Sequence, residues 1–73
     1  MHRELTVARV RGRDEADHVE VLFLESARIY RLLRERPDFD ELLDRLRLAE
    51  GGGTLRVELA SPDSDVIEDV QMS

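Results

Sequence analysis

The first part of the chain alternates between apolar and polar residues, and this period of two predicts strands. Residues 5–11 are rich in β-branched side chains and contain no breaker, so we predict a strand there. Its apolar phase shifts between Val7 and Val10, which indicates a bulge or a strong twist near Ala8. Residues 12–17 are polar and begin with a glycine, so this strand should end in a turn.

A nearly continuous apolar run follows over residues 19–24. A strand that is apolar on both faces is usually covered on both sides. Glu25 and Ser26 interrupt the run, and residues 27–33 resume the alternation, which predicts a tight hairpin across Glu25-Ser26 and a third strand. One continuous helix over residues 25–36 is the alternative, because apolar residues there also fit helical spacing.

The clearest helix signal comes after Pro37, which biases the residue before it away from a helix. Asp38, with Glu41 three residues later, has the spacing of a capping box, in which each side chain satisfies a free amide of the first turn. The glycines at 51–53 should end the helix, since glycine adopts the left-handed C-cap conformation at little cost. Between these signals lies one apolar stripe, formed by Phe39, Leu42, Leu43, Leu46 and Ala49 or Glu50.

Two further strands are predicted after the helix. Residues 55–60 alternate cleanly, residues 61–64 have the composition of a turn, and residues 66–72 form the last strand. The element order is therefore β-β-β-α-β-β in one α+β domain over residues 1–73. Two architectures fit this order: a small antiparallel five-stranded sheet with one helix, or an OB/SH3-like barrel with one helix.

The chain is too short to bury a large core, since a domain of 73 residues buries only about 60–65% of its unfolded surface. It contains no cysteine, so disulfides and thiolate metal sites are excluded. A second subunit is the remaining supplement for a small core. No apolar run is long enough to span a membrane, and the first residues lack the apolar region of a signal peptide, so we expect a cytoplasmic protein.

Charge is the most unusual feature of the composition. Charged residues make up 38% of the chain, the formal net charge is −6, and all eleven cations are arginine. The absence of lysine indicates codon bias in a GC-rich bacterial genome, with a thermophilic source as the alternative. The net negative charge argues against broad nucleic-acid binding, which needs clustered cations.

Catalytic and metal-binding patterns are absent from the sequence. No nucleophile has a histidine at a recognisable spacing, and the glycines at 51–53 follow a helix instead of opening one, as a phosphate loop would. His18 and Glu20 could supply two metal ligands, but zinc sites need three or four. We therefore expect no enzyme, no cofactor and no metal.

Two surfaces are candidates for binding. Arginines around the tyrosine could form an anion or nucleic-acid surface, in which the ring stacks on a base; this set is Arg9, Arg11, Arg28, Tyr30 and Arg56. Apolar residues expected to point away from the helix could form a self-association surface; these are Leu22, Leu24, Leu32 and Ile67. The sequence thus favours a small bacterial interaction or regulatory module that forms a homo-oligomer or binds a protein partner, with an OB/SH3-like nucleic-acid-binding domain as the alternative.

Overall fold

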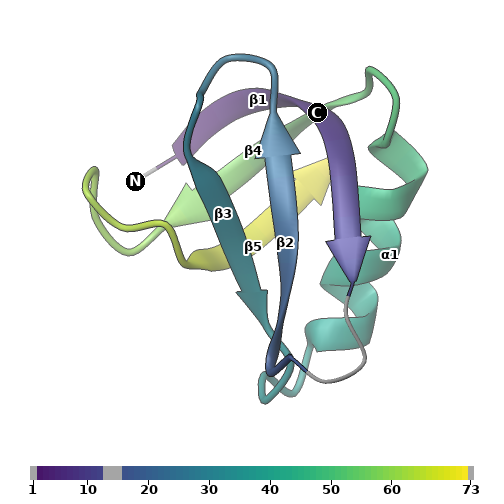
Figure 1. Cartoon of the computed structure of the whole chain (residues 1–73), viewed down its shortest axis with the longest axis vertical. Coiled ribbons are helices and arrows are strands. Elements are labelled where there is room, and N and C mark those ends of the chain that lie inside the picture. Colours follow the sequence, from purple (N-terminus) through teal and green to yellow (C-terminus); the bar gives the residue numbers. More distant parts are fainter. Residues whose placement is uncertain (1, 13–15, 73) are drawn as a thin grey trace.

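A computed structural model describes residues 2–12 and 16–72 of the chain. Its elements, in chain order, are β1 (His2–Gly12), β2 (His18–Phe23), β3 (Ile29–Leu33), α1 (Phe39–Ala49), β4 (Thr54–Leu59) and β5 (Ile67–Met72). The five strands form one antiparallel sheet in the order β3-β2-β1-β4-β5, and α1 packs beside it (Figure 1). The predicted α+β class and the order β-β-β-α-β-β are confirmed. The sheet is open and not closed into a barrel, so the first of the two architectures is the one observed.

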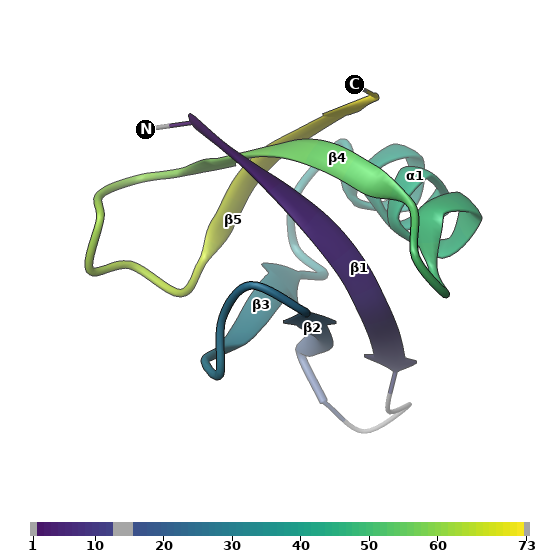
Figure 2. The same ribbon diagram turned by 90° about the horizontal axis from the view of Figure 1, so that it is seen from above.

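Strand β1 belongs to both halves of the sheet. Its residues 2–6 pair with β4, and its residues 7–12 pair with β2. The strand arches over the core between these two halves (Figures 1 and 2). Its pairing register with β2 shifts between Val7 and Arg9, so the predicted bulge at Ala8 is confirmed. Because of this extra residue, Val7 and Val10 both point into the core.

The glycine loop after the helix docks onto the bulge. The Gly52 amide donates to the Val7 carbonyl at 3.0 Å, and the Val7 amide donates to the Gly53 carbonyl at 2.9 Å. A Cβ atom at Gly53 would lie 2.8 Å from the Cα of Ala49, so a larger residue cannot take this place without moving the helix end. The glycines therefore do more than end α1: they fix its last turn against β1.

The segment after β2 is a strand, so the alternative of a helix over residues 25–36 is wrong. The connection is also wider than the predicted tight hairpin, because Leu22 and Ile29 form the last pair. In this register Tyr30 lies opposite Val21, inside the core. Tyr30 and Leu32 are both buried, so the prediction that this side of the strand faces outward is wrong.

Ile67 also lies in the core and not on the outer face. The register between β4 and β5 shifts between Glu58 and Leu59, which makes Glu68 an extra residue in β5. This bulge brings Ile67 and Val70, three residues apart, onto the same buried side. A strict period of two places them on opposite faces, which is why the sequence prediction for Ile67 was wrong.

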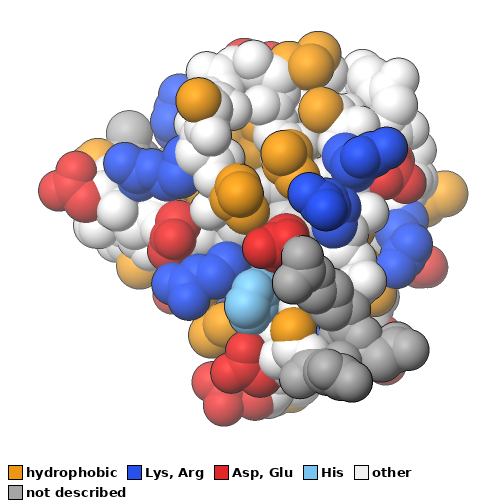
Figure 3. Space-filling model, in the orientation of Figure 1, with side chains coloured by type: hydrophobic (Ala, Val, Ile, Leu, Met, Phe, Trp, Pro, Cys, Tyr) orange, Lys and Arg blue, Asp and Glu red, His pale blue; other side chains and the backbone are white. Residues whose placement is uncertain are grey.

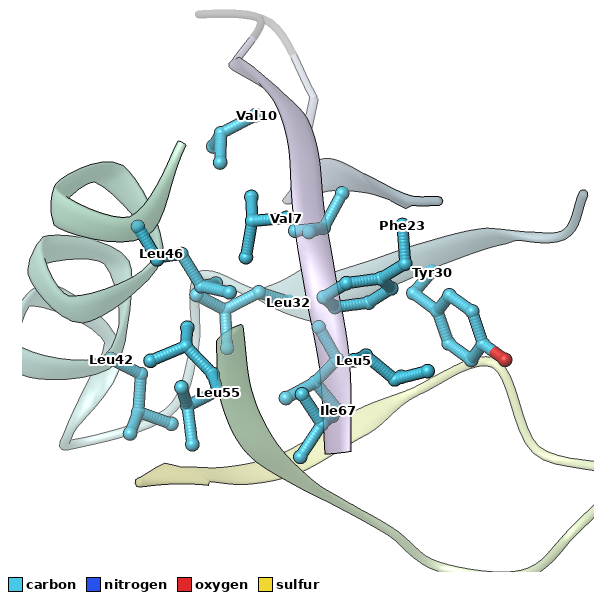
Figure 4. Packing of buried hydrophobic residues seen from close by; sticks show 14 of the residues in the cluster. Leu5, Val7, Val10, Phe23, Tyr30, Leu32, Leu42, Leu46, Leu55 and Ile67 are labelled. Carbon is cyan, nitrogen blue, oxygen red and sulfur yellow. The ribbon is translucent and has the colours of Figure 1, made fainter. Parts of the chain in front are cut away.

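Helix α1 closes one side of the core and contacts β1, β3, β4 and β5 (Figure 4). It begins after Asp38, as predicted, but the Asp38 side chain makes no capping hydrogen bond. Its carboxylate instead accepts from Arg36 at 3.0 Å, while Glu41 accepts from Arg45 at 2.9 Å. The predicted capping box is wrong because both carboxylates are held by arginines. The apolar stripe is confirmed, with Phe39, Leu42, Leu46 and Ala49 buried and Leu43 half-buried.

Half of the predicted turn over residues 12–17, namely residues 13–15, lies outside the described residues. Gly12 is the last residue of β1. The loop over residues 61–64 is confirmed as a turn, in which the Ser64 amide donates to the Ser61 carbonyl at 3.1 Å.

Two leucines of α1 provide a test of this packing. Leu46 is fully buried, whereas Leu48 is 76% exposed. Leu46→Ala should lower the free energy of unfolding by about 2–5 kcal/mol, through lost burial and the cavity it leaves. Leu48→Ala should change it by less than about 0.5 kcal/mol. Denaturant unfolding followed by circular dichroism measures both, and equal effects would show that the helix is oriented differently.

Candidate interaction surface

The arginines Arg9 and Arg11, called here the arginine pair, lie on the outer face of the sheet. They are exposed on either side of the buried Val10. In the pairing of β1 with β2, Arg9 lies opposite Leu22, and Arg11 lies opposite Glu20. These two members of the predicted anion surface are thus neighbours on β1, beside β2.

Tyr30 does not belong to that surface, and the prediction that its ring lies among exposed arginines is wrong. The residue is only 2% exposed, and its ring packs edge-on against Phe23 with centroids 5.2 Å apart. The hydroxyl reaches the rim of the core, where it lies 3.5 Å from the Ser26 hydroxyl. A ring held in this way cannot stack on a nucleic-acid base.

The other two predicted arginines lie elsewhere. Arg28 precedes β3 and donates to the Asp63 carbonyl at 3.0 Å, so it helps to hold the turn before β5. Arg56 lies on β4, opposite Glu4 of β1, in the other half of the sheet from the arginine pair. The five residues of the predicted anion surface therefore do not form one surface.

An apolar patch lies instead at the end of the outer face of β2 and β3 where these two strands are connected. We define it as Leu22, Leu24 and Ile29: Leu22 is half-buried, Leu24 is 70% exposed and Ile29 is 44% exposed. Leu22 and Ile29 are direct cross-strand partners, and Leu24 follows two residues after Leu22. Two of the four residues predicted for self-association thus lie on the surface, whereas Leu32 and Ile67 are fully buried. Sequence analysis missed Ile29 because it assigned the wrong side of β3 to the core.

The apolar patch and the arginine pair are adjacent. Figure 3 shows orange side chains over β2 and β3 and blue side chains beside them, toward β1. The cross-strand rows explain this arrangement, since Arg9 continues the row of Leu22 and Ile29. The next row joins Arg11, Glu20 and Arg31.

Two arginines near the sheet edges, Arg31 and Arg36, are bound to carboxylates. Arg31 pairs with Asp65 at 3.0 Å and thereby lowers the pKa of that carboxyl group. Arg36 donates to the Glu68 carboxylate at 3.0 Å and to the Glu68 carbonyl at 2.6 Å. In the described part of the chain, by contrast, no carboxylate lies within salt-bridge distance of either member of the arginine pair.

A carboxylate fixes the turn that carries Leu24. Glu25 accepts hydrogen bonds from the Thr6 hydroxyl at 2.6 Å and from the Thr6 amide at 2.7 Å. The Leu24 amide in turn donates to the Thr6 carbonyl at 3.0 Å. The hydrogen bond from the Thr6 hydroxyl, followed by that from its amide, lowers the pKa of Glu25 below its ordinary value of 4.5.

The described residues contain neither a metal-binding cluster nor a membrane-spanning helix. The His18 ring lies 3.0 Å from the Asp17 carboxylate and lowers the pKa of that group. Among residues 2–12 and 16–72, no three acidic, histidine or cysteine side chains are grouped so as to hold a metal ion. Over the same residues, no helix is long and apolar enough to cross a membrane.

Comparison with known proteins adds no relative from which a role could be inferred. No protein family model, no curated protein and no solved structure matches the chain. The surface chemistry of the chain itself is therefore the basis for the proposals that follow.

The hydrogen bonds of Glu25 predict a pH dependence of stability. Because the folded state lowers the pKa of this group, its contribution is present above pH 4.5 and is lost as the pH falls through the lower folded-state pKa. Glu25→Gln should lower the melting temperature at neutral pH and reduce the further loss on acidification. Glu35→Gln changes an exposed carboxylate outside this contact and is the control. If the melting temperatures of wild type and Glu25→Gln fall by the same amount on acidification, the role of Glu25 is contradicted.

Proposed function

We propose that this chain is a small, non-enzymatic protein-interaction module that acts through the apolar patch and self-associates there. The observation that carries the proposal is the exposure of Ile29, which pairs with Leu22 on the outer sheet face, and of Leu24 in the turn that follows β2. Exposed apolar residues that occur singly are ordinary, but adjacent ones on one face are typical of binding sites. Leu22 and Ile29 lie on regular strands, and Leu24 lies in the turn after β2, which hydrogen bonds to Thr6 hold in place.

The polar groups beside the patch support binding over catalysis. His18, the histidine of β2, has its hydrogen bond with the exposed Asp17 and not with a hydroxyl nucleophile. Glu20 lies between Arg11 and Arg31 in its cross-strand row and not opposite a second carboxylate. Such groups orient a partner by charge.

A second copy of the chain is the simplest occupant of the patch. A two-fold axis joins one surface to the same surface of another molecule, so a single apolar patch is sufficient for a dimer. Leu32 and Ile67, which were expected to extend this surface, are inside the core, so the area available is small. Small interfaces are typical of weak, transient association. We therefore propose a dimer that exchanges with the monomer.

Nucleic-acid binding is the weaker proposal. Its support was a tyrosine ring among arginines, and Tyr30 is buried while Arg56 lies in the other half of the sheet. Without an exposed aromatic ring, the surface lacks the stacking contact that holds single strands.

Sedimentation equilibrium over a range of concentrations tests the proposed self-association. Leu24→Glu should weaken the association at least ~10-fold, because it places a charge in the apolar contact. Leu48→Glu places the same charge on an equally exposed leucine of α1, away from the patch, and should leave the association unchanged. A wild-type chain that remains an 8.4 kDa monomer at every concentration would contradict self-association. Equal weakening by both variants would show that the patch is not the contact.

A further inference from the structure

We infer that the apolar patch and the arginine pair together bind a segment of another protein that carries apolar side chains flanked by carboxylates. This inference rests on the proposed role of the patch as an interaction surface. The proposed partner segment complements the surface in two ways: its apolar side chains match the apolar patch, and its carboxylates match the charge of the arginine pair.

The charge beside the apolar patch has the opposite sign to that of the whole chain. Three arginines and one glutamate lie on the outer face formed by the second half of β1 with β2 and β3: Arg9, Arg11, Arg31 and Glu20. Arg31 is paired with Asp65, so Arg9, Arg11 and Glu20 leave this face with a positive balance, although the whole chain has a formal net charge of −6. A basic face on an acidic protein is attracted specifically to an acidic partner group.

Salt bridges among the described residues do not neutralise the arginine pair. Arg31 is bound to Asp65 at 3.0 Å, and Arg36 is bound to Glu68 at 3.0 Å, whereas neither Arg9 nor Arg11 has a carboxylate within salt-bridge distance among the described residues. A free guanidinium can bind a carboxylate through two parallel hydrogen bonds. The arginine pair therefore offers the donors that an incoming Asp or Glu needs.

The arginine pair lies close to the apolar patch. Arg9 and Ile29 flank Leu22 in the same cross-strand row, so the exposed guanidinium starts one strand away from the centre of the patch. Neighbouring strands are about 4.8 Å apart. A segment of a few residues can thus cover the patch with apolar side chains and reach the arginine pair with a carboxylate.

A second copy is less well matched to this surface. The same face on two molecules brings apolar patch to apolar patch, but it also brings two arginine pairs into one interface. Like charges in an interface are unfavourable. The dimer should therefore be the weaker complex, and an acidic apolar segment should displace it.

The probe for this inference is a fluorescein-labelled octapeptide in which leucine alternates with aspartate or glutamate. Two matched peptides replace its acidic residues by lysine or its leucines by serine. We expect the acidic leucine peptide to bind, as measured by fluorescence anisotropy, and both matched peptides to bind at least ~10-fold more weakly. Its binding should weaken as salt is added, whereas the self-association of like-charged faces should not.

Variants of the protein separate the two proposals. The double variant Arg9→Glu, Arg11→Glu should reduce peptide binding at least ~10-fold, and Arg9→Gln is a milder second variant. Arg56→Glu is the control and should leave peptide binding unchanged. Circular dichroism verifies that each variant is folded.

Equal binding of the acidic and lysine peptides, or unchanged binding to the arginine variants, would overturn the acidic partner while leaving self-association intact. Tighter binding of a single-stranded oligonucleotide, lost in Arg9→Glu, would overturn it in favour of nucleic acid. If Leu24→Glu changes neither peptide binding nor self-association, the interaction surface itself is refuted.

Discussion

The fold depends on one strand, β1, that pairs with two different strands. Strand β1 pairs with β4 along its first half and with β2 along its second half, so the sheet must change direction within β1. The bulge at Ala8 makes this possible while Val7 and Val10 both stay in the core. The helix end stabilises the same point, because the Glu50 carboxylate accepts from the Val10 amide at 2.7 Å and the Val7 backbone bonds to the glycine loop.

This change of direction determines where the candidate surface lies. It turns β2 and β3 away from β4 and β5, so the core lies between the two halves and the outer face of β2 and β3 is left to solvent. The outer edges of β3 and β5 approach at an isolated parallel bridge between Arg31 and Val66. Arg36 lies next to this junction and holds β5 through both the carbonyl and the carboxylate of Glu68. Arginines thus close the edges, while Arg9 and Arg11 stay outside these contacts.

The sequence predicted those features that repeat over several residues. The stripe of α1, the element order β-β-β-α-β-β and the bulge near Ala8 follow from apolar periodicity, and the structure confirms them. The errors in assigning residues to the core or the surface came from single positions that change which face of a strand the next side chains occupy. The extra Glu68 in β5 moved Ile67 inward, and the pairing of Ile29 with Leu22 moved Tyr30 inward. For the candidate surface, the sequence found Leu22, Leu24 and the arginine pair but not Ile29, because its position depends on that cross-strand register.

The central claim is that the outer face of β2 and β3 is where this molecule contacts others. The most direct measurement is a concentration series of two-dimensional amide NMR spectra of the labelled wild-type chain. The account predicts that the amide shifts that change with concentration belong to β2, β3 and the second half of β1, with the largest changes at Leu22, Leu24 and Ile29. Concentration-dependent shifts confined to α1 or to β4 and β5 would contradict it.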